Sequence, residues 1–208
     1  LLDLVRACYA LRPDGINWAF DDEGMPSFKL EKLTEANGIA HENAHDAMSD
    51  VYATIAIAKL LKEKQPRMFN YLYSLRQKER IKPFLDFSKK EPFLYSSTAF
   101  LKEGRNTSVV LPVAINPKFR NKGYVFDLTQ DPTPLIELSS HEIQRRLFSP
   151  DPVLQEEGVE KIRILSIAYN RSPAIAPLKV LKENDAKRLG IDLALCKKHQ
   201  KMLAEYPE

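Results

Sequence analysis

A ten-residue stretch at positions 41–50, reading His-Glu-Asn-Ala-His-Asp-Ala-Met-Ser-Asp, brings several chemically active side chains close together in the sequence. It contains two of the four histidines of this 208-residue chain, together with one glutamate and two aspartates. A run of small and apolar residues follows and is typical of a helix. Two different sites can be built on this stretch, and the choice between them decides the predicted function.

The first interpretation is a zinc site of the His-Glu-x-x-His type, formed by His41, Glu42 and His45. On a helix, histidines four residues apart share a face and can share a zinc ion while the glutamate acts as base. The neighbouring residues disfavour it. Gly38 is typical of a helix C-terminus, so His41 is expected in a connection. Asn43 prefers helix caps, and no further His or Cys lies nearby as a third ligand.

The second interpretation uses His45 and Asp50, five positions apart. His45 would precede a helix, and Asp50 would lie in its first turns. An aspartate held by a helix can ligate Mg²⁺, and a histidine beside it can take a proton from a metal-bound water. The alternative is a capping aspartate with a surface histidine, and the spacing alone does not exclude it. The 3.6-residue period predicts a buried stripe on this helix at Ala47, Val51, Ile55 and Ala58.

The residues Gly38-Ile39 and the run from Asn43 to Thr54 resemble the third motif of the DEDDh 3′→5′ exonucleases. Nearly the whole chain resembles the bacterial exodeoxyribonuclease I family of DEDDh enzymes, which digest single-stranded DNA. Further matching stretches lie at 6–13, 15–18, 26–31, 65–67 and 188–191.

The resemblance implies that His45 is the general base and that Asp50 is a Mg²⁺ ligand. The reaction it implies is two-metal hydrolysis of phosphodiester bonds, which releases 5′-mononucleotides during DNA repair or recombination. It gives no role to His41 or Glu42. The alternative in a different class is a non-catalytic module that binds single-stranded DNA or a protein.

The family's other metal-binding carboxylates, an Asp-x-Glu motif and a further Asp, are expected upstream of Leu1. The chain's own candidate for Asp-x-Glu is the run Asp21-Asp22-Glu23. It falls between Trp18 and the turn residues that start at Gly24, which indicates a loop. We therefore do not expect it to bind the metals.

The resemblance also marks residues that would contact other molecules. Single-stranded DNA would be contacted by Lys29, Arg6, Lys78, Asn121 and Asn170, and the acidic tail of single-stranded DNA-binding protein by Arg12 and Tyr71. Pro177 and Ala204 depart from the family pattern near the tail site. Basic clusters can neutralise phosphates, and nearby aromatic rings can stack on bases. The alternative for any one of these cations is an ordinary solvated face.

Composition restricts the compartment and the kind of partner. No apolar run approaches the ~20 residues of a membrane span. The formal net charge is only +3, so a DNA surface must come from local clustering. Two cysteines make no disulfide framework, which fits a reducing cytoplasm. We expect a cytoplasmic monomer.

The pattern of elements predicts an α/β (α+β) protein in two parts. The resemblance implies that residues 1–65 are the helical end of a ribonuclease H-like exonuclease domain, and no strand is expected before residue 90. It implies an SH3-like domain for residues 66–208, whose pattern is β-rich with inserted helices. The predicted helices are 1–12, 28–36, 47–64, 69–80, 140–148, 185–189 and 192–204, and the predicted strands are 109–115, 124–128, 135–138 and 162–168.

Overall fold

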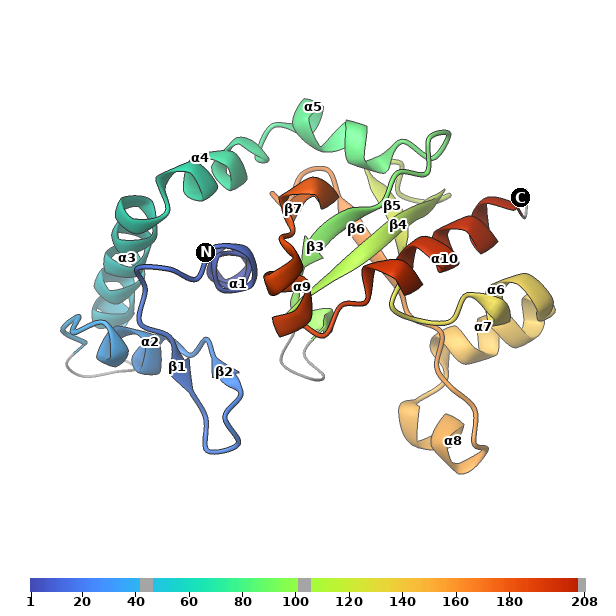
Figure 1. Cartoon of the computed structure of the whole chain (residues 1–208), viewed down its shortest axis with the longest axis horizontal. Coiled ribbons are helices and arrows are strands. Elements are labelled where there is room, and N and C mark those ends of the chain that lie inside the picture. Colours follow the sequence, from blue (N-terminus) through green and yellow to red (C-terminus); the bar gives the residue numbers. More distant parts are fainter. Residues whose placement is uncertain (42–46, 101–105, 206–208) are drawn as a thin grey trace.

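The computed structural model describes residues 1–41, 47–100 and 106–205, and it divides into a helical region and a sheet region joined by α1 (Figure 1). In the helical region, α1 (Leu2–Leu11) and the short hairpin β1 (Ala19–Phe20) and β2 (Pro26–Ser27) precede three helices. These helices are α2 (Leu30–Ala36), α3 (Ala47–Lys64) and α4 (Pro66–Ser74).

The centre of the sheet region is a five-stranded antiparallel sheet with the order β6-β5-β4-β3-β7. Its strands are β3 (Phe93–Ser96), β4 (Thr107–Ile115), β5 (Lys122–Asp127), β6 (Ile164–Ala168) and β7 (Ala174–Pro177). The other elements are α5 (Lys78–Ile81), η1 (Lys82–Leu85), η2 (Thr98–Phe100), α6 (Thr133–Glu137), α7 (Ser140–Phe148), α8 (Asp151–Glu156), η4 (Leu178–Val180), α9 (Glu183–Arg188) and α10 (Leu193–Glu205).

Helix α1 joins the two regions because it is apolar on several sides. Val5 and Cys8 pack with the interior of α2 and α3. Ala10 and Leu11 belong to the main core of the sheet, and Ala7 belongs to its second core. In Figure 1, α1 accordingly lies between the arc of α2, α3 and α4 and the sheet. The two regions therefore share one continuous interior.

Helix α3 forms as predicted but buries a different face. Ala53, Ile57 and Leu61 are buried against α1 and α2, whereas Val51 and Ile55 are 49% and 45% exposed. The predicted stripe at Ala47, Val51, Ile55 and Ala58 was therefore wrong. Both faces of this helix are apolar, so its period did not determine which face meets α1.

The sheet confirms the predicted hairpin, because β4 pairs with β5 through a register shift between Pro112 and Ala114. The strand predicted at 135–138 was wrong, and α6 occupies this segment. Pro134 suits the first turn of a helix, and the Asp131 carboxylate accepts the Thr133 N–H at 3.0 Å. The prediction of no strand before residue 90 missed β1 and β2, which pair through Ala19 and Ser27.

The helix predicted at 69–80 is interrupted, since α4 ends at Ser74 and α5 begins at Lys78. Strands β3 and β7 and helix α8 were not predicted at all. Among the helices that the structure describes, none has both the length and the apolar character needed to cross a bilayer.

Candidate catalytic residues and nucleic-acid interface

Asp50 lies in the first turn of α3 and makes a close contact with His41. The His41 Nε2 atom is 2.9 Å from Asp50 Oδ1. The two side chains differ in exposure, because His41 is 6% exposed and Asp50 is 44% exposed. The carboxylate therefore reaches solvent while its histidine partner is part of the interior.

The resemblance gives His41 no role, and the structure places its ring in contact with Asp50. His41 lies in the connection between α2 and α3 rather than on a helix, so the helical premise of the zinc interpretation does not hold. His45 and Glu42 lie outside the described residues. Within residues 1–41, 47–100 and 106–205, no group of three or more His, Cys, Asp or Glu side chains could hold a metal ion.

The acidic run Asp21-Asp22-Glu23 forms the turn between β1 and β2. The Asp21 carboxylate accepts the N–H groups of Glu23 at 3.1 Å and Met25 at 2.8 Å. It thus stabilises the hairpin turn, as expected for an aspartate at such a position.

Two of the predicted DNA contacts, Arg6 and Lys29, line one cavity of about 500 Å³. The Arg6 guanidinium is bonded to Asp3 at 2.6 Å and lies 6.0 Å from the ring centre of Phe28. Thr54 lines the same cavity and is one helical turn after Asp50, so these two residues share a face of α3. The cavity therefore lies on the side of α3 that carries the candidate metal ligand.

Two of the other three predicted DNA contacts line a groove of about 770 Å³ beside α5, here called the α5 groove, and the third is hydrogen-bonded to one of them. Lys78 and Asn121 line it, and the Asn121 side chain donates to the Asn170 side chain at 3.3 Å. Four of its lining residues are cations and one is an acid. The lining comprises Lys78, Lys82, Pro83, Leu85, Asp86, Lys89, Arg120, Asn121 and Tyr169.

Close packing between η1 and β5 builds this groove. Gly123 has no side chain, and a Cβ atom placed there would lie 2.9 Å from Phe87 and 3.3 Å from Leu85. The glycine therefore lets the basic segment that follows α5 approach the β4–β5 turn. On the other side, the backbone N–H of Tyr169 donates to the Asn121 carbonyl at 2.9 Å, which holds the two polar loops together.

The groove also contains an aromatic side chain suited to base stacking. Burial raises the pKa of Tyr169, and nearby Lys82 partly opposes this shift. Its ring stays neutral beside the cations, as a stacking surface requires. Phe119, in the turn between β4 and β5, is 55% exposed, and Lys122 Nζ lies 4.7 Å from its ring centre.

Arg12 and Tyr71, the two predicted tail contacts, border the same apolar cluster of the sheet region. Arg12 donates to the carbonyls of Leu11 and Val180, both of which belong to that cluster. Burial raises the pKa of Tyr71 to about 12, against a smaller opposite effect of Arg80. In the described part of the chain, the buried Tyr71 hydroxyl has no hydrogen-bond partner.

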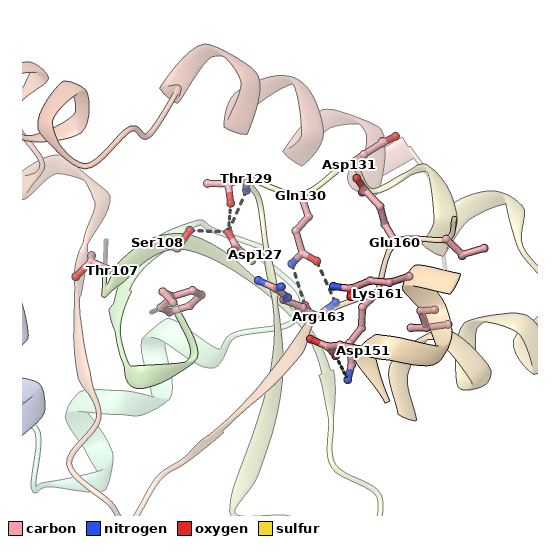
Figure 2. Close-up of a pocket in the computed structure, with 14 residues that line it drawn as sticks. Thr107, Ser108, Asp127, Thr129, Gln130, Asp131, Asp151, Glu160, Lys161 and Arg163 are labelled. Atoms are coloured by element: carbon pink, nitrogen blue, oxygen red, sulfur yellow. Dashed lines mark hydrogen bonds and ion pairs between the residues drawn. The ribbon is translucent and has the colours of Figure 1, made fainter. Parts of the chain in front are cut away.

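A different pocket, of about 460 Å³, lies near the other end of the sheet (Figure 2). Asp127 accepts from Ser108 at 2.5 Å and from Thr129 at 2.9 Å, and Lys161 is paired with Asp151 at 2.7 Å. Its charged lining residues are Asp127, Asp131, Asp151, Glu160, Lys161 and Arg163. Carboxylates outnumber cations, so this pocket does not suit phosphates.

Sequence reasoning missed two residues at these sites. His41 appeared only in the zinc interpretation, and no spacing rule predicted its contact with Asp50. Lys89 joins the α5 groove because the chain folds back after η1, where it lies 3.7 Å from Asp86. No sequence spacing links Lys89 to Asn121.

A five-stranded antiparallel sheet with inserted helices and a basic groove defines a small β-rich domain of the SH3-like class. Residues 76–208 match the family described as "Exonuclease I SH3-like domain". The chain therefore belongs to this family, and the predicted fold class is confirmed.

The chain is also similar to curated and solved proteins. It is 50% identical over 196 residues to exodeoxyribonuclease I of Haemophilus influenzae, covering 94% of this chain and 41% of that protein. It is 45% identical to E. coli exonuclease I in complex with a dA16 oligonucleotide, with a TM-score of 0.94, covering 100% of this chain and 44% of that one.

Two further solved structures of exonuclease I resemble the chain equally well. One is an exonuclease I complex with SSB-Ct, 43% identical with a TM-score of 0.90, which covers 100% of this chain and 44% of that one. The other is a zinc-bound form of the E. coli complex with single-stranded DNA, 44% identical with a TM-score of 0.92 and the same coverage. The chain thus spans less than half the length of the relatives that it matches.

Proposed function

We propose that this chain is part of a 3′→5′ exonuclease that digests single-stranded DNA into 5′-mononucleotides. The observation that carries the proposal is a basic groove lined by Lys78 and Asn121, with Asn170 hydrogen-bonded to Asn121, in a chain similar to nucleases solved with DNA. Four cations and one aromatic ring suit a flexible phosphate backbone with unpaired bases.

In this proposal the two ends of the DNA path have different tasks. The α5 groove holds the strand, and Arg6 and Lys29 hold its terminal nucleotide next to α3. Thr54 borders the Arg6 cavity on the same helix face as Asp50, so a strand end in that cavity lies close to the carboxylate.

Asp50 fits one ligand position of a Mg²⁺ site. Its half-exposed carboxylate offers the hard oxygen that Mg²⁺ prefers, at the start of a rigid helix. One carboxylate is too few for two ions, and we propose that the remaining ligands come from the family's Asp-x-Glu motif and further Asp. Bound Mg²⁺ would supply charge stabilisation to the attacking and leaving oxygens.

His45 is the proposed general base, which takes the proton of the attacking water. It stands five positions before Asp50, immediately ahead of α3. The resemblance in this stretch supports the assignment.

We also propose how the chain is divided and where it works. Residues 1–65 would complete the exonuclease domain, and 66–208 would form the SH3-like domain. The exposed α3 face with Met48, Val51 and Ile55 would pack against the rest of the exonuclease domain. The protein would act as a cytoplasmic monomer in DNA repair or recombination.

The proposed partner is the acidic tail of single-stranded DNA-binding protein, bound near Arg12 and Tyr71. An exonuclease I complex with SSB-Ct is similar to this chain, and the match covers 100% of this chain and 44% of that one. The cation of Arg12 and the unpartnered hydroxyl of Tyr71 within the described chain suit a carboxylate-rich peptide.

The experiment that tests this function uses a full-length protein that carries this chain. We expect Mg²⁺-dependent release of mononucleotides from the 3′ end of single-stranded DNA, and much slower attack on duplex DNA. His45→Ala should lower kcat by roughly 10²–10⁴-fold with little change in DNA affinity. His141→Ala is the matched control, because this histidine is exposed on α7.

DNA binding without any metal-dependent digestion by the full-length wild-type protein would refute this function. It would favour instead the non-catalytic binding module.

A further inference from the structure

We propose that His41 is a positioning residue that fixes the carboxylate of Asp50 in the orientation needed for metal binding. This inference rests on the proposed function, because it assigns Asp50 to the metal site. The contact that carries it is the 2.9 Å bond between His41 Nε2 and Asp50 Oδ1. An ionised carboxylate only accepts hydrogen bonds, so the histidine N–H is the donor.

The local backbone explains how His41 reaches this place. Helix α2 ends in a left-handed turn at Gly38, which has φ +64°. The N–H of Ile39 donates back to the Thr34 carbonyl at 2.9 Å, and the N–H of Gly38 donates to the Glu35 carbonyl at 3.1 Å. This turn closes the helix and directs the following residues back over its last turn. His41 is thereby placed between the end of α2 and the start of α3.

The imidazole ring is supported from behind by a rigid group. His41 Nδ1 lies 3.4 Å from the hydroxyl oxygen of Thr34, which is fully buried. The single proton of that hydroxyl is shared between the carbonyls of Leu30 and Glu31, which lie 2.9 Å from it. The contacts run from the interior of α2 through His41 to Asp50, so the ring cannot turn without breaking them.

The contrast in exposure explains what such a support achieves. A 44% exposed aspartate can adopt several rotamers, whereas a 6% exposed histidine has one position. A carboxylate has about four lone-pair sites, and the bond from His41 occupies one of them. Residues that orient a metal ligand in this way typically change metal affinity or activity by roughly 10–100-fold when they are mutated.

A purely structural role is the competing explanation. Asp50 lies in the first turn of α3, where an acidic side chain stabilises a helix without any metal. In that case His41 would merely anchor the start of the helix. The two explanations differ in their effect on metal affinity at equal folding stability.

The test compares His41→Gln with His41→Asn in the full-length protein. Both side chains end in an amide, but only the longer Gln places an N–H near the position of Nε2. We expect His41→Asn, and His41→Ala where it folds, to weaken Mn²⁺ binding in calorimetry by roughly 10–100-fold. The Mg²⁺ concentration for half-maximal digestion should rise in parallel. His41→Gln should restore most of the Mn²⁺ affinity and most of the Mg²⁺ response. His141→Ala should change neither the Mn²⁺ affinity nor the Mg²⁺ response.

Equal Mn²⁺ affinities for the Gln and Asn variants, or wild-type affinity in His41→Asn, would overturn the inference. A common loss of melting temperature with unchanged metal affinity would assign His41 to helix anchoring alone. Failure of the proposed function would look different, because wild-type protein would then not digest single-stranded DNA. The calorimetric comparison would still decide the role of His41.

Discussion

The helical region and the sheet region differ in how completely each surrounds its apolar surface. The sheet region encloses Phe93, Phe126 and Ile175 almost fully. In the helical region, one face of α3 is buried while the opposite face exposes Met48, Val51 and Tyr52, the last at 64%. Isolated exposed apolar residues are normal, but an apolar helix face is typical of a surface that another segment covers.

The candidate functional groups also differ between the helical region and the sheet region. The α5 groove is formed entirely by side chains of the described chain, with cations and polar groups from both of its walls. Asp50, by contrast, is a single carboxylate on the half-covered helix. We infer that strand binding belongs to what this chain provides, whereas hydrolysis also needs carboxylates from elsewhere.

Asp50→Ala in the full-length protein should have the largest effect. It removes a metal ligand, so digestion should fall at least as far as on loss of a catalytic base, roughly 10²–10⁴-fold. Higher Mg²⁺ or replacement by Mn²⁺ should partly restore the rate, while affinity for single-stranded DNA stays near wild type. The measurement is kcat against metal concentration, alongside a binding titration. A kcat equal to that of the wild-type protein would show that Asp50 is not a metal ligand.

Removal of two groove cations, Lys78→Ala with Arg120→Ala, should weaken binding in a salt-dependent way. The slope of log affinity against log salt should become less steep by about 0.7 for each phosphate that the variant no longer neutralises. The matched control is Lys182→Ala with Lys187→Ala, two exposed cations at α9. Equal slopes in both double variants would mean that the α5 groove is an ordinary solvated surface.

Gly123→Ala should disturb the groove without removing a charge. The new methyl group would lie 2.9 Å from Phe87, and overpacking of this kind typically costs about 1–3 kcal/mol. We expect a lower melting temperature together with weaker DNA binding, because the basic segment after α5 must move. Ser166→Ala on the neighbouring strand β6, where the side chain is exposed, should change neither quantity. Loss of stability with unchanged DNA affinity would show that the groove does not depend on this close packing.

Tyr71→Phe should have the smallest effect on folding and a clear effect on partner binding. Since its buried hydroxyl has no partner in the described residues, its removal should leave the free energy of unfolding nearly unchanged. Binding of an acidic tail peptide should weaken if the hydroxyl donates to it. Peptide affinity equal to wild type, measured by fluorescence anisotropy, would exclude the hydroxyl from the partner site.

The features that could be predicted from sequence are those controlled by local residues. Helix α1 ends before Pro13, and α7 is capped at its start by Ser139, whose hydroxyl accepts the Glu142 N–H at 3.3 Å. The β4–β5 hairpin was predicted because two strand patterns, at 109–115 and 124–128, are separated by a turn. Family resemblance marked Lys78 and Asn121, which line one groove, and Asn170, which is hydrogen-bonded to Asn121.

The features that were missed depend on contacts between distant segments. The buried face of α3 is chosen by α1 and α2, because both faces of the helix are apolar. The segment at 135–138 forms α6 because Pro134 and Asp131 favour a helix start over a strand. The His41–Asp50 bond requires the turn at Gly38, and the position of Lys89 requires the chain to return after η1.

The most direct test compares this 208-residue chain with a longer protein that includes the Asp-x-Glu motif, by measuring binding and digestion of the same single-stranded DNA. We predict salt-sensitive binding by both proteins and Mg²⁺-dependent digestion by the longer one alone. Robust digestion by the 208-residue chain would contradict this account. It would make Asp21, Asp22 and Glu23 candidate metal ligands despite their place in the β1–β2 turn.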